Sequence, residues 1–249
     1  MNSNNLEKQK EIILNLFKKK QYDDVIIQGE ILLKERQNDA QLIFILGMSS
    51  INIQNFNNAE KFFKKLILLD GKAENFYILG NIQKSLKKFN EAIISFQEAI
   101  KLHPNFSEAY NNLGNICKSL NENKQAIDNY KKAISLKENN FQAYFNLANL
   151  YYSLENYIDA SNYFKNITNL NVRNEEICEK YTICLFKIGK KKEVKEFVLS
   201  IISKYPNNRV LNNLVGQAML SLDSHIEGLS HIKKGAGFLQ IDMNGVKLL

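Results

Sequence analysis

The sequence predicts an all-α protein built from consecutive pairs of helices. Its 249 residues include only 2 prolines and 11 glycines, which is too few for the frequent tight turns of a β-sandwich or barrel. Segments of similar sequence also return at a fixed interval, since residues 73–106 and 107–140 align without a gap. A constant period of this length is typical of helical repeat proteins. We therefore expect helix after helix along the chain.

The repeat is clearest in residues 73–106, 107–140 and 141–174. Leu-Gly-Asn-Ile stands at both 79–82 and 113–116. Small and aromatic residues recur at matching places in the second half of each unit: Ala92, Phe96 and Ala99, then Ala126, Tyr130 and Ala133, then Ala160 and Phe164. Less regular units follow the same register over residues 6–39, 40–72 and 175–208, and a degenerate cap covers 209–239.

Each unit is predicted to hold two helices joined by a short turn. In unit 107–140, apolar and small residues at helical spacing predict one helix near 108–120 and a second near 124–137. The polar Asn121-Glu122-Asn123 lies between them. We expect Gly114 and Ala126 to face one another where the helices cross, because a larger side chain would separate the axes.

This pattern resembles the tetratricopeptide repeat (TPR), whose consensus places aromatic residues, Leu-Gly, alanines and proline at these positions. The resemblance covers about residues 6–208, with departures at Gly29, Ile43 and Cys178. It implies an all-α right-handed α-superhelix, a solenoid of helix-turn-helix repeats. It also implies that the first helices line a concave groove that contacts an extended peptide of a partner protein.

Carried onto this sequence, the groove positions hold mainly amides, with lysines beside them: Asn81, Lys84, Asn111, Asn112, Asn115, Lys118, Asn146 and Asn149. Amide side chains both donate and accept, so a ladder of them suits a ligand backbone. The chain is rich in asparagine throughout, and solvated surface positions are the alternative. We expect Asn112→Ala with Asn146→Ala to abolish partner capture and to leave the melting temperature unchanged.

Some TPR domains grip a terminal carboxylate with lysine and asparagine side chains. Here Asn111 and Glu176 stand at two of the cation places and only Lys180 remains, so this clamp is not expected, although Lys180 joins the predicted peptide-binding residues. Towards the N-terminus the groove turns apolar. These apolar residues are equally compatible with packing against the first repeat and with binding a ligand. The residues concerned are Phe44, Ile45, Met48 and Tyr77.

No enzyme, cofactor or metal site is expected. The three histidines are scattered, and Cys117, Cys178 and Cys184 lack metal-binding spacing. The net charge of +7 is spread thinly along the chain, so nucleic-acid binding is the least favoured function. With no apolar run long enough to span a membrane and a polar N-terminus, we expect a cytoplasmic protein.

The last residues, 240–249, depart from the repeats, because Asn244-Gly245 between apolar stretches predicts a β-hairpin. The sequence favours a protein–protein interaction scaffold that holds a partner in an asparagine-lined groove. The alternative is the substrate-recruiting region of an enzyme system, such as a glycosyltransferase, sulfotransferase or oxygenase, whose catalytic domain is absent or separate. Self-association through the apolar N-terminal repeats is a third interpretation.

Overall fold

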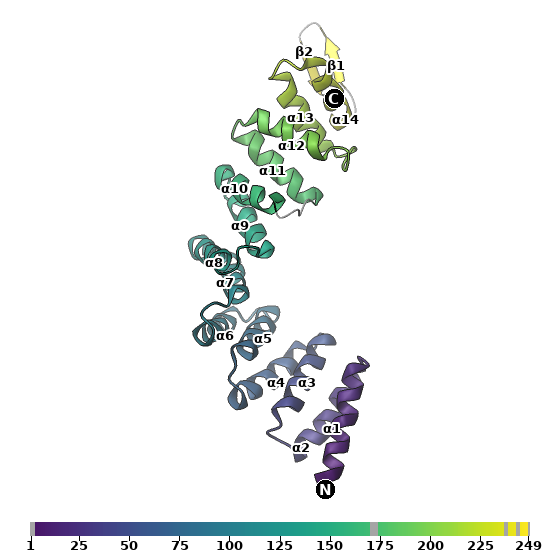
Figure 1. Ribbon diagram of the computed structural model, residues 1–249, viewed down its shortest axis with the longest axis vertical. Coiled ribbons are helices and arrows are strands. Elements are labelled where there is room, and N and C mark those ends of the chain that lie inside the picture. Colours follow the sequence, from purple (N-terminus) through teal and green to yellow (C-terminus); the bar gives the residue numbers. More distant parts are fainter. Residues whose placement is uncertain (1–2, 170–173, 237–238, 243–244, 249) are drawn as a thin grey trace. The chain divides into compact units, whose positions relative to one another are not determined.

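The computed structural model describes residues 3–169, 174–236, 239–242 and 245–248. These residues form fourteen helices followed by two short strands (Figure 1). The chain divides into two compact units, Met1–Leu136 (unit 1) and Lys137–Leu249 (unit 2). Unit 1 contains α1 (Ser3–Lys18), α2 (Tyr22–Glu35), α3 (Ala40–Asn52), α4 (Phe56–Leu69), α5 (Ala73–Ser85), α6 (Phe89–Leu102), α7 (Ser107–Ser119) and α8 (Asn123–Leu136).

Unit 2 contains six helices and the hairpin: α9 (Phe141–Ser153), α10 (Tyr157–Asn169), α11 (Glu175–Lys187), α12 (Lys191–Ile201), α13 (Arg209–Leu220), α14 (His225–Ala236), β1 (Leu239–Asp242) and β2 (Gly245–Leu248). The strands pair antiparallel, with Ile241 opposite Val246. Asn244 of the expected hairpin turn lies outside the described residues. Helix pairs account for nearly all the described structure, so the predicted all-α class is confirmed.

Side-chain caps fix where several of these helices begin. The carboxylate of Asp39 accepts the N–H of Leu42 at 3.0 Å at the start of α3, and Asn55, Asn140, Asn174 and Asn208 cap α4, α9, α11 and α13 in the same way. Such caps satisfy an N–H group that has no partner within the helix. Part of the asparagine content of this chain therefore serves to start helices.

A residue in the left-handed conformation reverses the chain inside every helix pair. These residues are Lys20, Gln54, Lys87, Asn121, Glu155, Gly189 and Asp223. In the fourth pair the Glu122 N–H donates to the Cys117 carbonyl at 2.8 Å, the bond that closes a helix C-terminus around a left-handed residue. Asp223 belongs to the turn between α13 and α14, so the region expected to be a degenerate cap contains a seventh helix pair.

In three of the pairs, the atoms nearest the glycine of the first helix differ from those of the predicted contact between Gly114 and Ala126. A Cβ atom added to Gly114 would lie 2.6 Å from Cε1 of Tyr130, whose ring is fully buried. Gly47 and Gly80 meet Phe63 and Phe96 in the same manner. The glycine is therefore required by a ring from the second helix, which occupies the space that a side chain would fill.

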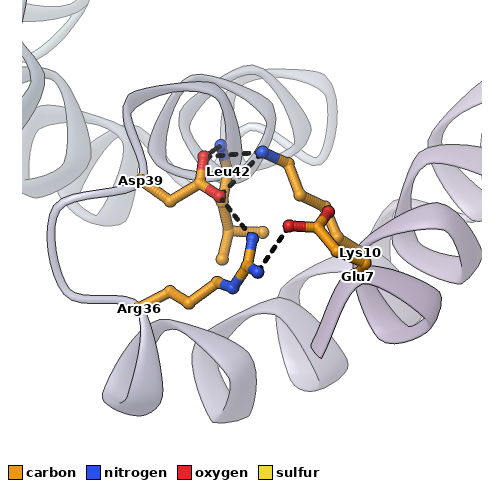
Figure 2. Close-up of polar contacts among 5 residues, drawn as sticks. All are labelled: Glu7, Lys10, Arg36, Asp39 and Leu42. Carbon is orange, nitrogen blue, oxygen red and sulfur yellow. Dashed lines mark hydrogen bonds and ion pairs between the residues drawn. The ribbon is translucent and has the colours of Figure 1, made fainter. Parts of the chain in front are cut away.

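An ion-pair cluster fastens α1 to the loop before α3 (Figure 2). Lys10 Nζ lies 2.7 Å from Asp39 Oδ2, and Arg36 lies 2.6 Å from Glu7 Oε1 and 3.5 Å from Asp39 Oδ2. Burial acts to raise the pKa of Asp39, but the hydrogen bonds from Lys10 and the Leu42 N–H, with the nearby cations, outweigh it and hold that pKa below its ordinary value. Asp39 therefore serves both as a helix cap and as an anchor for α1.

All three cysteines are buried and none of them forms a disulfide, as expected of core residues. None of the helices in the described part of the chain combines the length and apolar content needed to span a lipid bilayer. Within the same residues, no group of His, Cys, Asp and Glu side chains is arranged to hold a metal ion.

Candidate functional site

Asn112 is the centre of a polar network that joins α5 to α7. Its amide nitrogen donates to Asn81 Oδ1 at 2.9 Å and to the Tyr77 hydroxyl at 3.3 Å. Its amide oxygen accepts from Lys84 Nζ at 2.9 Å and from Asn115 Nδ2 at 3.4 Å. An amide offers two donors and two acceptor positions, so all four are used. We call these five residues the α5–α7 face.

A buried hydroxyl anchors the far side of this network. Tyr130 of α8 donates to Asn115 Oδ1 at 2.9 Å, and its burial raises the pKa of its phenol. The same ring fills the space beside Gly114, so the packing of the helix pair and the orientation of Asn115 depend on one side chain.

Four of the six residues predicted in unit 1 come together on the α5–α7 face: Asn81, Lys84, Asn112 and Asn115. Neither of the other two side chains is hydrogen-bonded to the Asn112 side chain. Asn111 is buried on α7, and Lys118 is exposed near the end of that helix. The predicted ladder in this unit is thus largely a set of side chains bonded to one another across two helices.

Lys84 is the cation of this face. Its side chain is half-buried, and that burial lowers the pKa of its ammonium group. Asn112 is its hydrogen-bond partner, and among the described residues no carboxylate lies within ion-pair distance of Lys84 Nζ. Asn81 uses its oxygen to accept from Asn112, while its amide nitrogen has no acceptor among the described side chains and carbonyls.

An apolar pocket of about 250 Å³ adjoins this polar network. We call it the Met48 pocket, and its lining residues come from α3, α4 and α5: Met48, Ile51, Phe56, Ile78, Asn81, Ile82 and Ser85. Asn81 belongs to both the pocket wall and the network, so the two features are continuous. Among the apolar lining residues, the sequence suggested Met48 only. Phe56 begins α4, the second helix of its pair, and Ile51 stands at the place that Lys84 holds in the next repeat but was not singled out.

The other apolar residues expected near this groove have separate roles. Ile45 is 5% exposed and belongs to the core. Phe44 lines a different pocket together with Gln41 and Leu66. Tyr77 belongs to the α5–α7 face through its hydroxyl. Packing therefore accounts for Ile45, and pocket lining for Met48 and Phe44.

In unit 2 the predicted residues form hydrogen bonds with side chains of α9 and α11. Lys180 Nζ donates to Asn149 Oδ1 at 2.6 Å and to Glu176 Oε1 at 2.7 Å. It also lies 5.9 Å from the ring centre of Phe145. Asn146 accepts from Gln142 at 3.2 Å. Lys180 thus has a carboxylate partner, which distinguishes it from Lys84.

Family models agree with the repeat register. A model described as TPR repeat matches residues 80–118 and 114–155, and one described as tetratricopeptide repeat matches residues 40–72 and 141–171. No curated protein matches the chain.

Solved structures of repeat proteins resemble it. The crystal structure of MamA is 30% identical over 63% of this chain and 92% of that one, with a TM-score of 0.60. YrrB, described as a TPR protein with an unusual peptide-binding site, is 20% identical over 70% of this chain and 91% of its own, with a TM-score of 0.61.

A third structure covers more of this chain. The C-terminal part of a TPR repeat-containing protein from Cytophaga hutchinsonii is 14% identical over 91% of this chain and 94% of its own, with a TM-score of 0.75. At this identity the likeness concerns the fold alone, and it supports the predicted all-α solenoid. The repeat matches, the helix pairs and the MamA similarity together lead to one conclusion: the chain belongs to the tetratricopeptide repeat family.

Proposed function

We propose that this protein is a non-catalytic, cytoplasmic scaffold that holds an extended segment of a partner protein against the α5–α7 face and the Met48 pocket. Tetratricopeptide repeats imply protein or peptide partners. The observation that carries the proposal is the continuity between the Met48 pocket and a set of hydrogen-bond donors, both held on packed helices. An apolar pocket with a few fixed polar groups is the usual form of a binding site.

The network changes the role assigned to each asparagine. Asn112 has no hydrogen-bonding capacity left for a ligand, so it positions Lys84 and Asn81, which do the binding. Asn115 and Lys118 extend the surface along α7, whereas Asn111 is buried on the same helix. Asn146, Asn149 and Lys180 form a corresponding set in unit 2, which we propose as a second contact region for the same type of partner.

A pair of matched variants tests whether the partner binds at the Met48 pocket and the α5–α7 face. Ser85 lies at the rim of the Met48 pocket and donates to the Asn81 carbonyl at 3.0 Å. Ser119 makes the equivalent bond to the Asn115 carbonyl at 3.0 Å and is also exposed. Ser85→Trp should fill the pocket without removing any polar group of the α5–α7 face, and Ser119→Trp adds the same ring one repeat away.

Affinity capture is then compared between the wild type and both variants. We expect specific partners to be retained by the wild type and Ser119→Trp, and to be lost from Ser85→Trp. Equal capture by all three proteins would rule out this face. A wild type that retains nothing above the empty matrix would count against the scaffold function itself.

A further inference from the structure

The α5–α7 face has more donors than acceptors to offer a ligand. The Lys84 ammonium carries three N–H groups, and the described contacts use one of them, to Asn112 Oδ1. The Asn81 amide nitrogen adds two more donors, while its oxygen is occupied by Asn112. Lys84 follows Asn81 by three residues on α5, so the two side chains share one side of the helix. A ligand that suits this pair must supply acceptors.

The positive charge of Lys84 further restricts which ligands suit this face. Two other partly buried lysines each have a carboxylate: Lys10 with Asp39 at 2.7 Å and Lys180 with Glu176 at 2.7 Å. Lys84 is half-buried and has a neutral amide as its described partner. A buried charge without a counter-ion costs free energy. An anionic acceptor at this point would therefore gain more than a neutral one.

The Met48 pocket determines which kind of side chain lies next to that anion. Ile78 and Ile82 of α5 line the pocket on the same helix that carries Asn81 and Lys84. Asn81 forms part of the pocket wall and also of the donor pair. A peptide that places an apolar side chain in the pocket thus brings its neighbouring residue to Lys84.

We propose that this face selects a peptide segment in which an aspartate or glutamate adjoins an aliphatic or aromatic residue. The carboxylate accepts from Lys84 Nζ and Asn81 Nδ2, and the apolar side chain enters the Met48 pocket. Asn112 acts as a positioning residue, because it orients both donors without contacting the peptide. This specificity rests on the proposed scaffold function and adds the chemical class of its ligand.

The test is a selection of random dodecapeptides displayed on phage against the immobilised full-length protein. The peptides are selected in parallel with the wild type, Lys84→Met and Lys132→Met. Lys132 is exposed on α8, outside the proposed contact surface, so it controls for the general loss of one positive charge. Circular dichroism melting curves verify that each variant is folded.

We expect wild type and Lys132→Met to enrich peptides with an acidic residue next to an apolar one, and Lys84→Met to lose that preference. Enriched peptides without an acidic residue, or the same motif with Lys84→Met, would overturn the inference and leave the scaffold function standing. Failure of the wild type to enrich any peptide would count against both.

A second measurement uses the wild type alone and does not depend on how a variant folds. An enriched peptide is synthesised with its acidic residue and with the matching amide, Glu→Gln or Asp→Asn, and the two affinities are compared by isothermal titration calorimetry. Loss of a hydrogen bond between charged groups should weaken binding by about 10-fold or more. Equal affinities would overturn the proposal.

Discussion

At the scale of single residues, Asn112 shows how a predicted ligand group can be a structural one. Counting positions along the repeats was sufficient to place Asn81, Asn112 and Asn115 near one another. The pairing between them depends on contacts across two helices, such as Asn112 Nδ2 to Asn81 Oδ1, and on side-chain rotamers that no periodicity encodes. From the sequence, Asn112→Ala together with Asn146→Ala was expected to leave the melting temperature unchanged, whereas the network predicts that loss of Asn112 destabilises the fold.

We predict that Asn112→Ala lowers the free energy of unfolding by about 1–3 kcal/mol, because Lys84 and Asn81 lose their common partner in a half-buried setting. Urea denaturation followed by circular dichroism measures the loss. Asn90→Ala is the control, since Asn90 is exposed on α6 and should change stability by less than about 0.5 kcal/mol. Equal midpoints for the two variants would show that the network contributes nothing.

The contact between Gly114 and Tyr130 leads to a second residue-scale prediction. In Gly114→Ala the new Cβ would lie 2.6 Å and 2.7 Å from two ring carbons of a fully buried side chain. Overpacking of this kind destabilises by about 1–3 kcal/mol. Gly71→Ala is the matched control, because its nearest atom would be 3.4 Å away. If both variants unfold at the same urea concentration, the ring does not require the glycine.

At the scale of elements, Asp39 holds the first helix in place. The pKa of its carboxyl is lowered in the folded protein. Its contribution is therefore fully present above the ordinary carboxyl pKa of about 4 and is lost as pH falls through the lower native value. We predict that the wild type loses stability in this acid range, and that Asp39→Asn loses less because it has no charge to neutralise.

Thermal melting at a series of pH values from neutral to about 3 measures this difference. Asp39→Asn retains an amide oxygen that can cap α3, so the comparison isolates the ion pairs to Lys10 and Arg36. Parallel pH profiles for the two proteins would show that these pairs do not contribute to stability.

The turns inside the helix pairs give a prediction about backbone conformation alone. Gly189 has a φ of 77°, and a Cβ added to it would meet no atom within 4 Å. Gly189→Ala should therefore lower the unfolding free energy by about 1 kcal/mol through left-handed strain only. Lys87→Gly, which relieves a residue with φ of 58°, should shift the denaturation midpoint in the opposite direction. A shift of the same sign in both variants would contradict this account.

At the scale of the whole chain, the sequence predicted well those features that depend on the repeat period, such as where helices begin. Helices α3, α5, α7, α9, α11 and α13 begin at residues 40, 73, 107, 141, 175 and 209, where aligned residues marked the starts of repeats. The seventh pair was harder to read because Gly216 and Gly228 bring two backbones together, and this contact leaves few side chains to display a pattern. Met48 was named as a possible pocket residue, but the other walls of the Met48 pocket were missed because they come from three helices.

The spacing of the left-handed residues also shows where this chain can change length. The interval from Gln54 to Lys87 is one residue shorter than the others, and the missing residue belongs to the loop at residues 70–72, because α3, α4, α5 and α6 keep the lengths of their counterparts. A reporter tag inserted in that loop should leave the flanking pairs folded. The same tag beside Lys87 would displace the one residue on which the reversal depends, and solubility on expression would distinguish the two insertions.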